Sequence, residues 1–209
     1  DPGDVVYDPF AGRGTTPLEA ALAGRVPAAC DINPLTAVLL APRLVPPVPA
    51  DVQRRLAAID FHRRVDLPDD LFVFYQRDTL QEVCALREHL LERERDGTLD
   101  DADRWIRMVA VNRLTGHSPG FFSVYTLPPN QATSVQAQRK INKVRAQVPP
   151  RRDVPALILR KTKALLKDCD DQTRTTLAGL RTVQQLITRP ADSTPAIRSA
   201  SVDLVVTSP

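Results

Sequence analysis

The sequence is poor in several features, and each shortage excludes a class of protein. Its three cysteines, Cys30, Cys84 and Cys169, are odd in number and far apart in the chain. This excludes a disulfide framework and zinc-ligand spacing, so we expect a reduced, intracellular protein that holds no metal. No stretch approaches the roughly 20 apolar residues of a membrane helix, so no membrane partner is expected. The chain begins Asp-Pro-Gly without a methionine, so we expect a fragment of a longer protein.

Acidic residues are almost missing from one long segment. Between Arg104 and Lys167 there are 13 lysines and arginines against a single acid, Asp153, which is a net of +12. The rest of the chain has 15 basic and 24 acidic residues, a net of −9, so the total of +3 hides a strong separation. This separation favours a polyanion as partner, and the alternative is a solvated basic surface without one.

A glycine-containing turn near the start of the chain follows an apolar run. Residues Val5–Asp8 predict a strand that ends in an acid, Gly12 and Gly14 form the turn, and residues 18–23 begin a helix. The spacing is not that of a dinucleotide-binding loop, because Pro17 stands where the third glycine or alanine belongs. No Lys-Ser/Thr pair of a phosphate-binding loop follows either. The pattern therefore favours a cofactor that is not held by its phosphates.

Two further apolar runs end in polar residues. Residues 26–30 predict a second strand that ends at Asp31, where Rossmann-like folds bind ribose hydroxyls. The two strand-end acids and the turn predict an adenosine ligand without phosphates. Residues 201–209 have the pattern of a buried strand that runs into Ser208 and Pro209. An ordinary Ser-Pro turn is the alternative interpretation of that end.

Residues 8–16, followed by Asp-Ile-Asn-Pro at 31–34, resemble the S-adenosylmethionine motif of DNA amino-methyltransferases. These enzymes methylate the exocyclic nitrogen of adenine or cytosine. The alternative is a generic Rossmann turn without activity. The resemblance implies an α/β fold with a Rossmann-like class I methyltransferase sheet, interrupted by a mostly helical insertion, and S-adenosyl-L-methionine as cofactor. The cofactor-binding residues that it implies are Asp8, Pro9, Phe10, Gly12, Gly14, Thr15, Asp31, Ile32 and Asp192. For Asp192 the alternative is a simple turn aspartate.

In the same family a central strand ends in a catalytic tetrapeptide of Asp, Asn or Ser, then Pro-Pro, then an aromatic residue. The resemblance implies that Ser208 and Pro209 are its first two residues and are catalytic. The rest of the tetrapeptide and several strands would come from an unseen segment or another chain. Serine at this place favours cytosine N4 over adenine N6 as the target. Cytosine C5 methylation is not expected, because it needs a nucleophilic cysteine after a proline and no cysteine here follows one.

The motif order predicts three regions. Residues 1–45 form the cofactor-binding half, residues 46–188 a helical, basic target-recognition insertion, and residues 189–209 the return to the sheet. Within the insertion, helical spacing of apolar residues predicts helices over 51–59, 134–147, 156–167 and 173–188, among others. Residues 114–131 mix glycine, proline and aromatics. They are either a base-contacting loop or a structured loop with Phe121 and Phe122 in the core.

The basic helices predict phosphate contacts with double-stranded DNA. The residues expected to make them are Arg139, Lys140, Lys143, Arg145, Arg151, Arg152, Lys161 and Lys163. An RNA methyltransferase and a non-catalytic DNA-binding or partner-binding fragment are the alternatives. A DNA methyltransferase of this family implies the bacterial cytoplasm, in association with the nucleoid.

Overall fold

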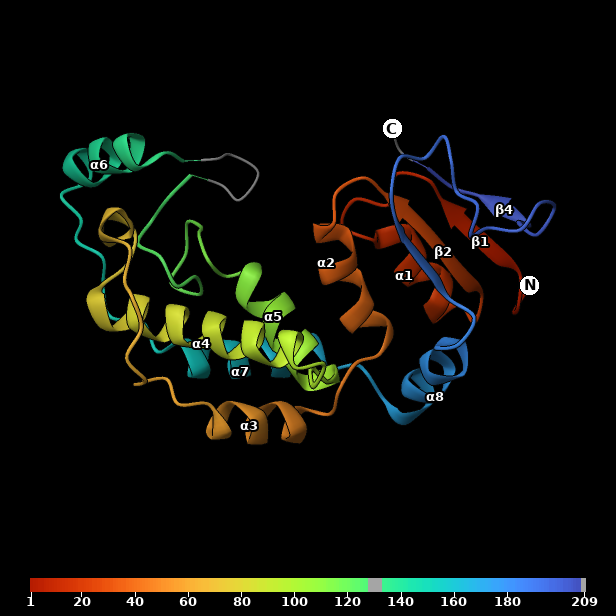
Figure 1. Ribbon diagram of the computed structural model, residues 1–209, viewed down its shortest axis with the longest axis horizontal. Helices are drawn as coiled ribbons and strands as arrows, with labels where there is room; N and C mark the ends of the chain where they lie inside the picture. The colour runs from red at the N-terminus through yellow and green to blue at the C-terminus, as the bar shows by residue number, and fades with distance from the viewer. Residues whose placement is uncertain (128–132, 208–209) are drawn as a thin grey trace. The chain divides into compact units, whose positions relative to one another are not determined.

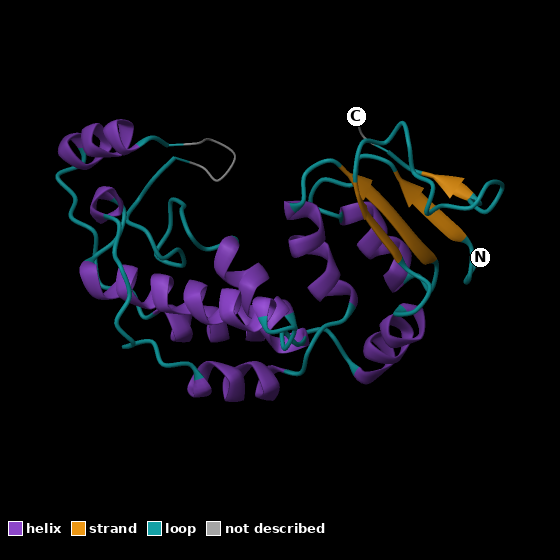
Figure 2. Cartoon of the chain, in the orientation of Figure 1, coloured by secondary structure: helices purple, strands orange, loops and turns teal. Residues whose placement is uncertain are grey.

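The computed structural model describes residues 1–127 and 133–207, and the chain divides into two units. Unit 1 comprises Asp1–Pro47 with Leu166–Pro209, and unit 2 comprises Val48–Leu165. In the described part the chain has one four-stranded, all-parallel sheet and eight α-helices (Figures 1 and 2). This α/β architecture is compatible with a Rossmann-like class.

The sheet belongs to unit 1, and its strand order is β3-β2-β1-β4. The strands are β1 (Val5–Asp8), β2 (Val26–Asp31), β3 (Gln185–Thr188) and β4 (Leu204–Val205). Since all four are parallel, their carboxyl ends meet at one edge. The chain passes from β1 to β2 on one side, while β4 pairs with β1 on the other side. The carboxyl end of β1 is therefore a topological switch point, where α/β sheets bind ligands.

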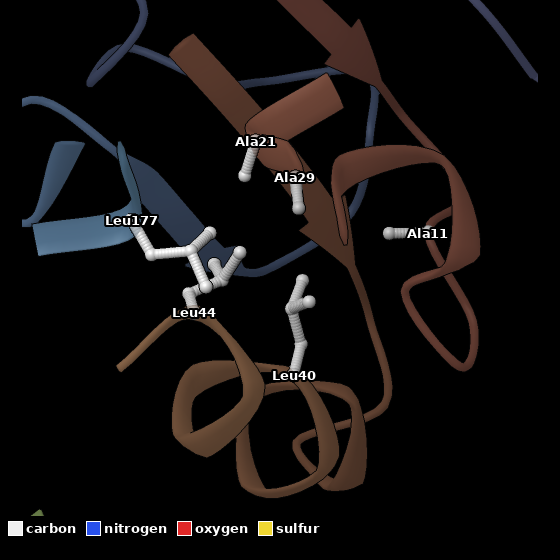
Figure 3. Close-up of a cluster of buried hydrophobic side chains, with 6 residues drawn as sticks. All are labelled: Ala11, Ala21, Ala29, Leu40, Leu44 and Leu177. Atoms are coloured by element: carbon white, nitrogen blue, oxygen red, sulfur yellow. The ribbon is translucent and has the colours of Figure 1, made fainter. Parts of the chain in front are cut away.

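Three helices of unit 1 form the core with one face of the sheet. They are α1 (Thr15–Leu22), α2 (Leu35–Leu44) and α8 (Asp171–Leu180). Figure 3 shows the buried cluster, which consists of Ala11, Ala21, Ala29, Leu40, Leu44 and Leu177. Alanines from the turn after β1, from α1 and from β2 let the backbones approach, and leucines from α2 and α8 fill the remaining space. Burying each such leucine contributes about 1.5–3 kcal/mol.

Unit 2 contains the remaining helices. They are α3 (Pro49–Ala58), the 3-10 helix η1 (Asp69–Val73), α4 (Arg77–Arg95), α5 (Asp101–Val111), α6 (Val135–Val144) and α7 (Val154–Leu165). α3, α4 and α5 all pack against α7. The buried indole of Trp105 donates from Nε1 to Thr162 Oγ1 over 3.0 Å, which fixes α5 on α7.

One predicted helix was wrong over its last part. The helix expected over 173–188 is α8, which ends at Leu180, and Gln185–Thr188 form the strand β3 beside β2. Gly179 and a turn separate the two elements, and the β-branched residues that follow suit a strand. The return to the sheet unit was expected at residue 189, and unit 1 resumes at Leu166.

Candidate cofactor site and nucleic-acid interface

Two acids stand at the carboxyl ends of the two neighbouring central strands. Asp8 ends β1 and Asp31 ends β2, so both lie at the edge that contains the switch point. Asp8 is buried, and its Oδ1 accepts a hydrogen bond from Phe10 N over 3.0 Å. This bond turns the chain out of the strand into the glycine-containing turn. Asp8 therefore shapes the start of the site.

Asp31 joins the turn after β1 to the segment after β2. Its Oδ2 accepts from Gly12 N over 2.7 Å, and its Oδ1 accepts from Asn33 N over 2.8 Å. The hydrogen bond from Asn33 is the largest of several that lower the pKa of Asp31 and keep it ionised. An ionised carboxylate has about four acceptor positions, so Asp31 retains capacity for hydroxyl groups.

The two glycines of the turn have different roles. Gly14 has φ +76° and directly precedes α1, and a Cβ there would lie 2.8 Å from Leu40 Cδ1. Glycine at this position therefore allows α1 to pack against α2. Gly12 has φ +51°, and a Cβ there would meet nothing closer than 3.9 Å, so the space beside it is open. Thr15 is exposed at the first position of α1, and no side chain caps that end of the helix in the described part.

Two apolar side chains are exposed beside the acids. Phe10, which follows the half-buried Pro9, has 55% of its surface exposed, and Ile32 has 71% exposed. They stand in the turns that follow β1 and β2. Exposed apolar side chains beside a carboxylate suit a ligand that combines a flat ring with hydroxyl groups. The residues at this edge therefore fit an adenosine group.

The remaining predicted residues of the site are placed only in part. Arg189 N donates to Asp31 O over 3.1 Å, so the segment after β3 starts beside Asp31, and Asp192 is exposed three residues later. Val206 N donates to Tyr7 O over 3.0 Å, so strand pairing reaches to within two residues of Ser208. Ser208 and Pro209 themselves lie outside the described residues.

In unit 2, α6 presents three of the predicted phosphate-binding residues. Arg139, Lys140 and Lys143 are exposed, and none of them makes an ion pair within the part of the chain that the structure describes. Gln138 Nε2 donates to Tyr125 O over 2.9 Å, and Asn142 Nδ2 donates to Val73 O over 2.7 Å. The amides hold one face of α6 against the unit, and the charged face is left to solvent.

The other residues predicted to contact phosphates differ in their exposure and in their partners within the protein. Arg145 stacks over the ring of Tyr125 with its Cζ 3.8 Å from the centroid, Lys161 is half-buried and Lys163 is exposed. Arg152 is half-buried, whereas Arg151 forms an ion pair with the buried carboxylate of Glu82. Glu82 also accepts from Val154 N over 2.9 Å, so Arg151 helps to anchor α7 on α4. Arg151 thus has a structural partner that the sequence did not reveal.

The irregular loop of unit 2 is structured in its described part. Phe121 and Phe122 are buried, as in the second of the two interpretations of residues 114–131. A Cβ on Gly116 would lie 2.5 Å from the ring of Phe121, and Thr126 N donates to Gly116 O over 2.9 Å. The loop is therefore closed around Phe121. Residues 128–131 of this loop lie outside the described residues.

Sequence reasoning did not assign Arg113 to the interface. Arg113 follows α5, and its guanidinium stacks over the ring of Phe121, with Cζ 4.8 Å from the ring centroid. The scarcity of acids is the signal that could have drawn attention to it, since Asp153 is the only acid between Arg104 and Lys167. Helical periodicity could not, because Arg113 lies in the turn beyond the end of α5.

Comparisons of the chain with protein-family models, with curated proteins and with solved structures found no match. Within residues 1–127 and 133–207, no group of three or more His, Cys, Asp or Glu side chains is arranged to hold a metal. None of the helices in those residues has the length and apolar character needed to span a membrane.

Proposed function

We propose that this chain is part of an S-adenosylmethionine-dependent DNA amino-methyltransferase, with cytosine N4 favoured over adenine N6. The observation that carries the proposal is the bond between Asp31 and Gly12 at the switch point of the sheet. It joins the two halves of the sequence pattern that resembles the methyltransferase motif. The basic segment of unit 2 supports DNA as the partner, because most of its cations have no carboxylate beside them.

The residues of unit 1 suit each part of the cofactor. Asp31 would accept hydrogen bonds from the two ribose hydroxyls, and Phe10 and Ile32 would cover the adenine ring. The open space at Gly12 admits the ligand close to the backbone. Asp192 would reach the adenine amino group. When bound, the cofactor supplies a methyl group that its sulfonium already activates, so positioning is the main task of the protein.

The acceptor chemistry requires two further steps. A base amine inside a duplex is out of reach, so the base must leave the stack. The lone pair of the amine nitrogen is conjugated with the ring and is a poor nucleophile. Hydrogen-bond acceptors must therefore bind the amine hydrogens as the nitrogen attacks the methyl group. In this proposal Ser208 provides one acceptor and a carbonyl of the Pro-Pro segment another. Unit 2 is the target-recognition insertion, and its cations bind the phosphates.

Calorimetric titration with S-adenosylmethionine tests the cofactor site. We expect one site per chain, and Asp31→Ala should weaken binding about tenfold to a hundredfold, because it removes charge-assisted hydrogen bonds. Asp168→Ala is the matched control, since Asp168 is an exposed acid of the same unit at a distance in sequence from the motif. Circular dichroism must show that each variant is folded. If the folded wild-type chain does not bind S-adenosylmethionine, or if Asp31→Ala and Asp168→Ala bind it with equal affinity, the proposal that this chain belongs to an enzyme is wrong.

Binding of one labelled sequence as duplex DNA and as single-stranded RNA tests the acceptor. We expect tighter binding of the duplex and a loss of affinity as salt rises. Preferential binding of RNA would favour the RNA methyltransferase. Duplex binding without any affinity for the cofactor would favour a non-catalytic DNA-binding fragment.

A further inference from the structure

Two valines at the end of α6 leave almost their whole side chains in solvent. Val144, the last residue of the helix, has 87% of its surface exposed, and Val148, four residues later, has 83% exposed. Among the large apolar side chains of residues 1–127 and 133–207, these two are the most exposed. We call residues 144–148 the α6 tip. Its apolar surface has no place in the core of unit 2.

The backbone of the α6 tip is held in one conformation. Gln147 N donates to Asn142 O over 3.0 Å, and Ala146 N donates to Lys143 O over 3.2 Å. These two bonds form a Schellman motif, which ends a helix in a defined turn. The side-chain Nε2 of Gln147 also donates to Asn142 Oδ1 over 2.8 Å and to Tyr125 O over 2.9 Å. The tip is therefore tied to unit 2, and its exposed side chains project from a fixed frame.

Ala146 occupies the position of this motif that usually belongs to glycine. Its φ is +48°, in the left-handed region where a Cβ crowds the backbone. The side chain is exposed, so packing within the protein does not account for its methyl group. Backbone strain of this kind is found at sites of binding and catalysis. Ala146 thus adds a third apolar side chain to the surface between Val144 and Val148.

Cations flank this apolar surface. Lys140 and Lys143 are exposed and belong to no ion pair of the described residues. Arg145 follows Val144 directly, and its guanidinium lies over the ring of Tyr125 instead of against a carboxylate. The charges around the α6 tip are therefore positive, so a polyanion would be drawn onto the valines.

We infer that the α6 tip enters the major groove of a bound duplex, where Val144, Ala146 and Val148 pack against the methyl groups of thymines. The inference rests on the proposed function, because that function supplies the duplex. Phosphates offer no apolar surface, whereas the thymine methyl group lies in the major groove, which admits a helix. The neighbouring cations bind the phosphates and position the tip, and the apolar side chains add contacts to the bases.

The size of the apolar side chains argues against a lipid surface as the partner. Helices that lie in a membrane interface bury large side chains such as Trp, Phe and Leu. The α6 tip has two valines and an alanine, and its turn is fixed by hydrogen bonds. Short, rigid methyl groups suit the edge of a base better than the interior of a bilayer.

Removal of the valine side chains tests the inference by salt-dependent binding of a mixed-sequence duplex. The double variant Val144→Ser, Val148→Ser should weaken binding about tenfold at 0.15 M salt, because each valine loses an apolar contact worth a factor of about three. The salt slope should equal that of the wild type, since no phosphate contact is lost. Val183→Ser, which changes an exposed valine of unit 1, is the matched control and should alter neither quantity. Circular dichroism checks that each variant is folded.

A duplex with uracil in place of thymine gives a second measurement, because it lacks only the methyl groups. The wild type should bind it about fivefold more weakly than the thymine duplex, and the double variant should bind both duplexes equally. Equal binding of the two duplexes by the wild type would overturn the assignment to thymine. Binding of phosphatidylserine vesicles that depends on the valines, with duplex binding unchanged, would assign the tip to a membrane instead.

Failure of the inference can be told apart from failure of the proposed function. If the wild-type chain binds duplex DNA and the double variant binds it as Val183→Ser does, the role of the α6 tip is wrong while the proposed function stands. A loss of affinity with a lower salt slope would also overturn the inference, because the valines would then act only by positioning the cations. A wild-type chain that binds no duplex would contradict both.

Discussion

The basic residues of unit 2 fall into two groups that differ in what surrounds them. Up to Arg107, most arginines face a carboxylate, and their ion pairs are Arg54–Asp51, Arg55–Asp100, Arg55–Asp103, Arg63–Glu92, Arg87–Glu88, Arg93–Asp100, Arg93–Asp103, Arg104–Asp101 and Arg107–Glu94. From Arg113 to Lys163, over residues 113–127 and 133–163, Arg151 is the one lysine or arginine in an ion pair. The first group is paired within the fold, and we propose that the second binds a partner.

The centre of the first group is the fully buried side chain of Asp103. It receives Arg93 and Arg55, and its Oδ2 accepts from Asp100 N in the capping box of α5. A charge buried to this degree is tolerated only when it is paired and hydrogen-bonded. In the second group Arg151 alone has such a partner, the buried Glu82, within the described residues. Removing the other members should therefore affect binding and leave stability almost unchanged.

The largest expected effect is on stability. Arg93→Ala removes a partner of the buried Asp103 and should lower the free energy of unfolding by about 3 kcal/mol. Arg139→Ala, on the exposed face of α6, should change it by less than about 0.5 kcal/mol. Urea denaturation of both variants measures the difference. Equal losses would mean that the two groups do not differ as described.

The next effect is on DNA binding. The triple variant Arg139→Gln, Lys140→Gln and Lys143→Gln should weaken duplex binding about a hundredfold at 0.15 M salt, because three phosphate contacts are lost.

Its control removes the same charge from paired positions. The variant Arg63→Gln, Arg104→Gln and Arg107→Gln should have a salt slope close to that of the wild type, because these side chains already face carboxylates. Fluorescence anisotropy over a range of salt concentrations measures both slopes. A control that loses as much affinity would show that only the total charge matters.

A smaller effect on stability should come from a substitution in the loop after α5, at Gly116. In Gly116→Ala the new Cβ would meet the ring of Phe121 at 2.5 Å, so Phe121 must shift and take Arg113 with it. We expect a loss of about 2 kcal/mol in stability, as in other overpacked sites. Thermal unfolding measures it, with Gly97→Ala as control for a turn glycine whose surroundings are open. Gly97 has φ +68° and Gly116 has no positive φ, so the control reports backbone strain without a clash. A Gly116→Ala variant as stable as the wild type would contradict the close contact with Phe121.

The smallest effect concerns pH and unit 1. The pKa of Asp31 is lowered in the folded state, so its contribution to stability is present above the unfolded value of about 3.9 and is lost as pH falls through the folded pKa. Asp31→Asn should therefore cost about 1 kcal/mol at pH 5–7, and the difference from the wild type should shrink only below about pH 4. A difference that disappears already near pH 6 would contradict this assignment.

Much of unit 1 could be predicted from the sequence, because its elements are local. The strand ending at Asp8, the turn with Gly12 and Gly14, and the strand ending at Asp31 follow from short patterns, and all three occur. β3 was missed because Leu177, Leu180 and Val183 continue a helical spacing up to the strand. Only the pairing of β3 with β2 decides against a helix there.

The sequence could predict the excess of positive charge, but it could not show which basic side chains pair with a carboxylate inside the protein. Arg151 and Glu82 are far apart in sequence, and nothing local shows that they pair. The stacking of Arg113 over the ring of Phe121 likewise depends on how the loop folds back after α5. Long-range contacts therefore decide which cations remain available, and these contacts are what residue spacing does not contain.

The central claim is that one chain holds a methyl donor at the switch point and a nucleic acid on its basic segment. It is tested most directly by calorimetric titration of S-adenosylmethionine into the wild-type chain, into Asp31→Ala and into the α6 triple variant. We predict that Asp31→Ala loses cofactor affinity, and that the α6 triple variant keeps it while losing duplex affinity. Cofactor binding that is absent from the folded wild type, or unchanged in Asp31→Ala, would contradict the claim.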